Sequence, residues 1–156
     1  MTDKNCIFCK ILRGEADSFV IWEDMKHVAF LSIFPNTRGA TVVIPKAHVP
    51  SYAFDAENNI LTDLVLAAKT VAKLLDAKLD GVARTAMVFE GYGVDHLHAK
   101  LFPMHGTGAD SRFRPIHSNV NKYFDNYEGY ISSHDWKRAD DRELGELARF
   151  LRTDNV

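Results

Sequence analysis

The sequence predicts an α+β domain built from a five-stranded antiparallel sheet, one long helix and a C-terminal helix. Short runs rich in β-branched and aromatic residues supply the strands, and they lie before and after one long helical stretch instead of alternating with helices. The chain has 156 residues, which is long enough to bury a sizeable core in a single domain covering residues 1–156.

The predicted strands are short segments bounded by turn residues. They comprise residues 18–23, 27–33, 41–44, 85–89 and 96–102. The first two flank a short polar stretch and predict a hairpin. The third ends at Pro45, because proline cannot donate to a ladder, and the last two are joined through glycines at 91 and 93.

The predicted helices follow from apolar residues spaced three and four apart. The long helix spans residues 55–79, with Asp55 as a plausible N-cap and Gly81 after its end. The second spans residues 139–152 and carries one apolar stripe, formed by Leu144, Leu147, Ala148 and Leu151.

Charge and composition limit the partners that can be expected. The chain has 19 basic and 21 acidic residues, so it lacks the overall cationic field that draws proteins to nucleic acid or anionic membranes. We see no signal peptide and no membrane-spanning segment, and two cysteines are too few for a disulfide framework. These observations predict a cytoplasmic protein with reduced thiols.

The most informative segment for chemistry is the predicted strand at 96–102. Alternate side chains of a strand share a face, so His96, His98 and Lys100 line up at steps of roughly 6.6 Å. The alternative is a polar strand face that simply meets water. Imidazole is nucleophilic while neutral near physiological pH, and a nearby ammonium can neutralise a phosphoryl oxygen. We therefore assign His98 as a nucleophile toward phosphorus and Lys100 as its electrostatic support.

The string His96-Leu97-His98-Ala99-Lys100-Leu101-Phe102-Pro103 resembles the signature of the histidine triad (HIT) superfamily, in which histidines alternate with apolar residues. Residues 6–11, 29–33 and 43–48 resemble other characteristic segments of that family, in the same order. The resemblance covers a core of about residues 5–104, and a C-terminal extension of about residues 105–156 lies outside it.

The resemblance implies a HIT-like fold and a homodimer in which two five-stranded sheets join into one. It implies a hydrolase or nucleotidyl transferase that holds a purine nucleotide beside the signature strand and forms a covalent nucleotidyl adduct on His98. Candidate substrates are nucleoside phosphoramidates and dinucleoside polyphosphates. His96 and Lys100 complete the implied catalytic set, and a backbone carbonyl of the neighbouring strand residues would orient His98.

The resemblance also implies a set of substrate-binding residues, which comprises Ser32, Ile33, Glu90, Gly93 and Val94. Several positions of the implied catalytic and binding set depart from the family pattern. Lys100 replaces the usual third histidine, Ser32 an aspartate that holds the ribose hydroxyls, and Glu90 an asparagine. The alternative reading is therefore a nucleotide-binding or partner-binding module with weak catalysis.

A metal site is the second candidate feature. Cys6 and Cys9, two residues apart, can present two thiolates to one tetrahedral zinc ion if two further ligands come from elsewhere in the fold. His48 and His96 are the candidates, and some bacterial relatives implied by the resemblance use the matching four positions. Four protein ligands would make the zinc structural. The alternatives are two free thiols or a redox pair.

Overall fold

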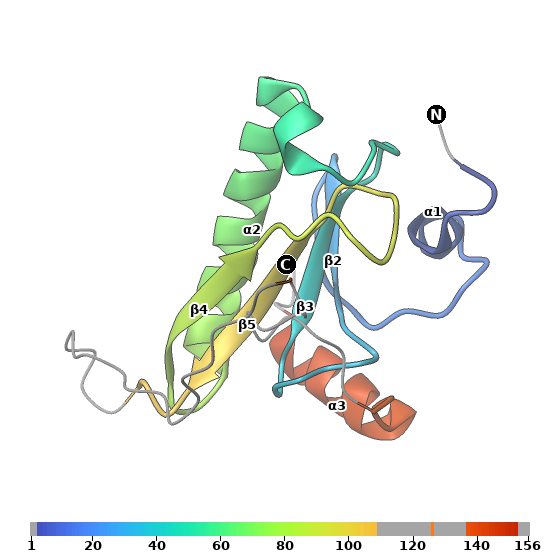
Figure 1. Ribbon diagram of the computed structural model, residues 1–156. Coiled ribbons are helices and arrows are strands. Elements are labelled where there is room, and N and C mark those ends of the chain that lie inside the picture. The colour runs from blue at the N-terminus through green and yellow to red at the C-terminus, as the bar shows by residue number, and fades with distance from the viewer. Residues whose placement is uncertain (1–2, 109–125, 127–136, 153–156) are drawn as a thin grey trace.

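The computed structural model describes residues 3–108, 126 and 137–152 (Figure 1). Its strands are β1 (Val20–Glu23), β2 (His27–Leu31), β3 (Thr41–Pro45), β4 (Val82–Val88) and β5 (Ala99–His105). Its helices are α1 (Ile7–Leu12), the short 3-10 turn η1 (Ala53–Asp55), α2 (Asn58–Lys78) and α3 (Asp141–Leu151). The strands form one antiparallel sheet in the order β1-β2-β3-β5-β4, which confirms the predicted α+β class.

The turn between β1 and β2 is fixed by an aspartate. Asp24 Oδ1 accepts hydrogen bonds from the backbone N–H groups of Lys26 (2.7 Å) and His27 (2.6 Å). The His27 ring also lies 3.2 Å from the same oxygen through Nδ1. This side-chain turn explains why the polar stretch between two apolar runs closes a hairpin.

The last strand begins later than the sequence predicts. β5 starts at Ala99 instead of residue 96, because its ladders with β3 and β4 start at Ala99 and Lys100 respectively. Before that point the backbone pairs elsewhere, with the Leu97 N–H donating to the Val49 carbonyl at 2.7 Å. The strand then runs through Pro103, which lies beyond its ladder with β3 and is tolerated there because no donor is needed on that side.

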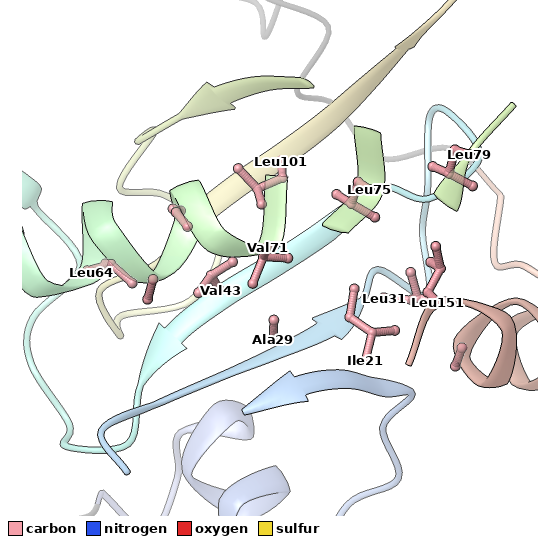
Figure 2. Close-up of a cluster of buried hydrophobic side chains, with 14 of the residues drawn as sticks. Ile21, Ala29, Leu31, Val43, Leu64, Val71, Leu75, Leu79, Leu101 and Leu151 are labelled. Carbon is pink, nitrogen blue, oxygen red and sulfur yellow. The ribbon is translucent and has the colours of Figure 1, made fainter. Parts of the chain in front are cut away.

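The main core lies between one face of the sheet and helix α2 (Figure 2). Leu64, Val71 and Leu75 of α2 are fully buried against Val43 of β3 and Leu101 of β5. The spacing of the α2 residues is that of one helical face, as the sequence predicts. The helix begins at residue 58, three residues later than expected, because Asp55 ends the preceding 3-10 turn and Glu57 takes the N-cap position.

Helix α3 closes the lower end of this core (Figure 1). Its predicted stripe of Leu144, Leu147, Ala148 and Leu151 is buried. Asp140 caps the helix by accepting from the N–H groups of Arg142 and Glu143. The Ala139 N–H donates to the Ile33 carbonyl at 2.9 Å, so the start of α3 is tied to the segment that follows β2. Residues 109–125, 127–136 and 153–156 of the predicted C-terminal extension lie outside the described residues.

Helix α1 covers the other face of the sheet, opposite α2 (Figure 1). Phe8, Ile11 and Leu12 pack against a second buried cluster, formed by Val28, Phe30, Val42 and Ile44. This helix was not predicted from the sequence, although apolar residues at 7, 8, 11 and 12 have helical spacing. Among the described helices, we find none that is long and apolar enough to cross a bilayer.

Candidate active site and metal cluster

His98 lies on the face of the sheet that α1 covers. Its side chain is nearly buried, with 3% of the residue surface exposed, and it lines a cavity of about 340 Å³. Leu97, Ala99 and Leu101 point to the opposite face and belong to the main core. The predicted alternation is therefore confirmed, and it separates the imidazole from the apolar core on the other side.

The orientation of the His98 ring is fixed by a backbone carbonyl. Its Nδ1 lies 2.7 Å from the His96 carbonyl oxygen. A carbonyl can only accept, so Nδ1 must carry the proton and Nε2 the lone pair. Burial lowers the pKa of His98 below its ordinary value, and the positive charge of Lys100 lowers it further, while the hydrogen bond to His96 and the charge of Glu90 oppose the shift. The neutral, nucleophilic form is thus favoured.

Lys100 lines the same cavity and forms an ion pair. Its Nζ lies 3.0 Å from Glu90 Oε2, and the side chains are 21% and 13% exposed. Glu90 follows the end of β4, which pairs with β5 through Val88 and Lys100. The structure therefore places Glu90 against Lys100 instead of in the cavity wall, so its predicted contact with substrate would act through the lysine.

The other four predicted substrate-binding residues meet around the cavity. Ser32, Ile33, Gly93 and Val94 all line it together with His98 and Lys100. Ser32 Oγ accepts a hydrogen bond from the Phe34 N–H at 3.2 Å, which holds the hydroxyl at the end of β2. Residues from the β2 end and from the loop before His96 thus converge on one space. Their roles in binding stay predictions.

The cavity has an apolar wall that was not predicted from the sequence. This wall includes Ile7, Phe8, Ile11, Phe30 and Val42. Phe30 and Val42 lie on strands in the same face as His98, so strand alternation could have identified them. The α1 residues could have been found only by recognising a helix in residues 7–12. Tyr92, which is 73% exposed, and Asp17 also contribute to the cavity lining.

The four predicted metal ligands form one cluster. One donor atom from each of Cys6, Cys9, His48 and His96 lies within 4.8 Å of the other three. Cys6 Sγ and His96 Nδ1 are 3.5 Å apart, Cys9 Sγ and His48 Nδ1 are 3.5 Å apart, and Cys9 Sγ and His96 Nδ1 are 3.7 Å apart. Tetrahedral zinc with Zn–S of ~2.3 Å and Zn–N of ~2.0 Å separates sulfur and nitrogen by about 3.5 Å. The donor set therefore fits zinc.

A hydrogen bond from the second ring nitrogen of His96 leaves its other nitrogen free to bind a metal ion. Its Nε2 donates to the Pro45 carbonyl at 2.9 Å, which leaves Nδ1 unprotonated and facing both cysteines. Burial lowers the pKa of His96, which also favours the neutral ring. The His96 ring is not part of the cavity lining, so the contribution of this residue to the His98 site comes from its backbone carbonyl.

Helix α1 connects the two sites. It carries Cys9 of the cluster and, between the two cysteines, Phe8 of the cavity wall. The Phe8 ring packs edge-on against His98 (5.6 Å between ring centroids) and His96 (5.8 Å), and against Phe30 (5.5 Å). The metal cluster and the cavity are thus neighbouring features on one side of the sheet.

Comparison with known proteins agrees with this arrangement. A family model described as the HIT domain matches residues 13–107. The chain belongs to the HIT domain family. An uncharacterised 16.1 kDa HIT-like protein of Mycoplasma pneumoniae is 36% identical over 112 residues, which cover 69% of this chain and 77% of that protein. Cys6 and Cys9 lie before the matched residues.

Two further HIT proteins bear on activity and on fold. The adenosine 5'-monophosphoramidase of Saccharomyces cerevisiae is 36% identical over 101 residues, covering 65% of this chain and 63% of the enzyme. A crystal structure of a HIT-like protein from Bartonella henselae, described as involved in cell-cycle regulation, has a TM-score of 0.65 at 26% identity and covers 97% of each chain. That structural match extends beyond the HIT domain into the region of α3.

Proposed function

We propose that this HIT domain protein is a hydrolase or nucleotidyl transferase that cleaves a nucleoside phosphoramidate through a covalent nucleotidyl adduct on His98. One observation carries the proposal. His98 donates through Nδ1 to the His96 carbonyl, so that Nε2 is the basic nitrogen of a ring that lines a cavity next to Lys100. This is the arrangement that a neutral imidazole needs to act as a nucleophile without a separate base.

The reaction has two displacements at phosphorus. In the first, the Nε2 lone pair forms a bond to the phosphorus of the 5'-phosphoramidate, and the phosphorus–nitrogen bond of the substrate breaks. The leaving amine departs with that electron pair and takes a proton from solvent. In the second, water attacks phosphorus and releases one proton to solvent, and the bond to Nε2 breaks with its electron pair returning to the ring. The products are a nucleoside 5'-monophosphate and neutral His98.

The cavity supplies two kinds of recognition. The apolar wall from α1, Phe30 and Val42 suits the flat face of a nucleobase, and Ser32 Oγ offers a hydroxyl for the ribose. Lys100 can neutralise charge that develops on a phosphoryl oxygen. The likeness to an adenosine 5'-monophosphoramidase supports adenosine as the nucleoside and an amine as the leaving group. A dinucleoside polyphosphate is the other candidate substrate, and its rate of hydrolysis should be compared with that of the phosphoramidate.

Cys6, Cys9, His48 and His96 would hold a structural zinc ion. The ion would cross-link α1 to the segments that follow β3 and precede β5. Four protein ligands leave no open coordination position, so the proposed mechanism assigns the chemistry to His98 and Lys100.

We also propose a cytoplasmic homodimer in which the sheets of two subunits join. β1 and β4 are the edge strands of the sheet, and Met87 of β4 is 41% exposed. An edge strand is the part of a sheet that can pair with a second chain. Light scattering coupled to size exclusion should then give the mass of two chains, and a mass of one chain would contradict the proposal.

Intact-mass spectrometry tests the nucleophile. The protein is mixed with adenosine 5'-phosphoramidate and quenched in alkali, where a phosphorus–nitrogen bond to histidine survives. We expect an added adenylyl group that peptide mapping places on His98. His98→Ala should lose both the adduct and turnover, whereas His105→Ala, at the end of β5 and outside the cavity, should keep both. Hydrolysis that persists in His98→Ala would overturn the assignment.

A binding module with weak catalysis is the second candidate, favoured by the Lys100–Glu90 ion pair in place of a third histidine. Calorimetry with AMP beside the hydrolysis assay separates the two functions. AMP binding together with turnover supports the enzyme, and AMP binding without turnover supports the module.

A further inference from the structure

Helix α1 takes part in both the metal cluster and the nucleotide cavity. Cys9 faces His48 and His96, while Ile7, Phe8 and Ile11 form part of the wall beside His98. The helix has six residues, which is too short to be stable through its own hydrogen bonds. Its position must therefore come from the side-chain contacts that it makes with the sheet.

We propose that metal binding at the Cys6, Cys9, His48 and His96 cluster and nucleotide binding in the His98 cavity are thermodynamically coupled, with Phe8 as the positioning residue that links them. The inference rests on the proposed function, since it requires a nucleotide in the cavity. It assigns to the metal a second effect besides stability, namely control of affinity for the nucleotide.

The first route of coupling is the cavity wall. Phe8 lies between the two cysteines in sequence, so a metal ion that fixes both sulfur atoms also fixes the backbone that carries the Phe8 ring. That ring packs against His98 at 5.6 Å and against Phe30 at 5.5 Å between centroids. When the cluster holds its ion, the wall is already in place and a nucleotide need not order it.

The second route is the His96 backbone. The His96 ring would bind the metal through Nδ1 and is held by the Pro45 carbonyl through Nε2. The carbonyl of the same residue accepts the hydrogen bond from His98 Nδ1 at 2.7 Å. Fixing the His96 ring thus restricts the group that orients the nucleophile. Phe8 contacts this ring as well, at 5.8 Å between centroids.

Coupling between two binding sites is reciprocal. If zinc tightens AMP binding by some factor, AMP must tighten zinc binding by the same factor. We expect a factor of about 5 to 50, which is within the usual range for coupled sites. A structural zinc that only holds the fold together would give tight zinc binding with no response to AMP.

The test measures both affinities on the full-length protein. Zinc affinity is obtained by competition with a chromophoric chelator, with and without saturating AMP, and AMP affinity by calorimetry with the zinc-loaded and metal-free proteins. We expect the same gain in both experiments. Because the metal-free chain could lose structure, the rate of zinc release to excess chelator, measured on the loaded protein with and without AMP, gives an independent readout. AMP should slow that release.

Phe8→Ala tests the assigned residue. Truncation of the Phe8 ring will directly lower the affinity for zinc and the affinity for AMP. These direct losses cancel when the affinity for one ligand with the other bound is divided by its affinity without the other. We expect this ratio to fall toward 1 in Phe8→Ala and to stay at the wild-type value in Phe54→Ala. Phe54 is a matched control because this residue is 83% exposed and lies outside the cavity lining. Full coupling retained in Phe8→Ala would overturn the role of Phe8.

The outcomes separate this inference from the proposed function. If AMP binds with equal affinity to both metal states, and zinc release does not respond to AMP, the coupling is wrong while the proposed function stands. If AMP binds to neither state, the proposed function fails and the inference fails with it. Equal gains in the two affinities support the coupling, and the hydrolysis assay then tests the proposed function separately.

Discussion

The ammonium of Lys100 lies 3.0 Å from the carboxylate of Glu90. Lys100 follows the proposed nucleophile His98 by two residues. Lys100 therefore lines the cavity, and its positive charge is partly balanced by Glu90, which lies outside the cavity lining. A neutral pair of this kind can polarise toward a phosphoryl group as negative charge develops there, without drawing anions into the cavity indiscriminately.

The charge of Lys100 should matter for the chemical step. We expect Lys100→Gln to lower kcat for phosphoramidate hydrolysis by about 100-fold, since one transition-state donor is usually worth that much. Lys100→Arg keeps the charge and should lose less. Steady-state kinetics with separate kcat and KM values checks this, and an unchanged kcat in Lys100→Gln would show that the lysine serves only binding or structure.

Neutralising Lys100 and neutralising Glu90 should move the pH profile of activity in opposite directions. Burial and the charge of Lys100 lower the pKa of His98, and the charge of Glu90 opposes this shift. The neutral ring is the reactive form, so activity should persist below pH ~6.5, the ordinary value for histidine. Lys100→Gln should raise the pKa of His98 and move the acidic limb of kcat/KM to higher pH. Glu90→Gln should lower it and move the limb to lower pH.

Among the residues that the structure describes, the charged groups around His98 are Lys100, its partner Glu90 and Asp17 in the cavity wall. Asp17→Asn serves as the control for a carboxylate that is not paired with Lys100. Profiles of kcat/KM report the free enzyme and are the measurement of choice. A shift of the same sign in the Lys100 and Glu90 variants would contradict the electrostatic account.

Removal of the metal should lower the melting temperature. A ligand present at 1,000 times its dissociation constant stabilises the folded state by about 4 kcal/mol, and zinc at the cluster would act in this way. We expect a strong chelator to reduce the melting temperature of the wild type. Cys9→Ser lacks a fully buried candidate ligand, so its melting temperature should be lower than that of the wild type even without chelator and should change little when chelator is added. Equal responses of the two proteins would argue against the site.

A substitution on the opposite face should affect stability and leave the site intact. Leu101 is fully buried in the main core, next in sequence to Lys100 but on the α2 side of the sheet. Leu101→Ala should cost about 2–5 kcal/mol of unfolding free energy, while Leu66→Ala, at a residue 54% exposed, should cost far less. Both variants should keep KM near the wild-type value at temperatures where they are folded, and denaturant unfolding with kinetics measures the two effects.

The sequence predicted the fold well where side-chain periodicity is long enough to be distinctive. The 21 residues of α2 and the stripe in α3 are of this kind. The six residues of α1 are too few to show a period against their background, although Ile7 and Ile11 have the right spacing. The predicted start of β5 is too early because a strand extends only as far as its partners pair with it. In the antiparallel ladder, the last residue of β4, Val88, pairs with Lys100 near the start of β5.

The site was predictable to the extent that it depends on alternation within one strand. His98 and Lys100 share a face for that reason. The ion pair between Lys100 and Glu90 depends on the path of the loop after β4, which residue order does not reveal. The four candidate metal ligands were predicted from the CxxC spacing and the family resemblance. The β3–β5 pairing brings the segment after Pro45 close to His96.

The two faces of the segment 97–101, which leads into β5, are under different constraints. Leu97, Ala99 and Leu101 are buried in the main core, whereas His98 and Lys100 line a cavity and Lys100 forms an ion pair with Glu90. Side chains on the cavity face can therefore be exchanged in evolution at little cost to folding. The same scaffold can accept different polar residues at positions 98 and 100, so new reactivity can arise here through changes at alternate positions of one extended segment.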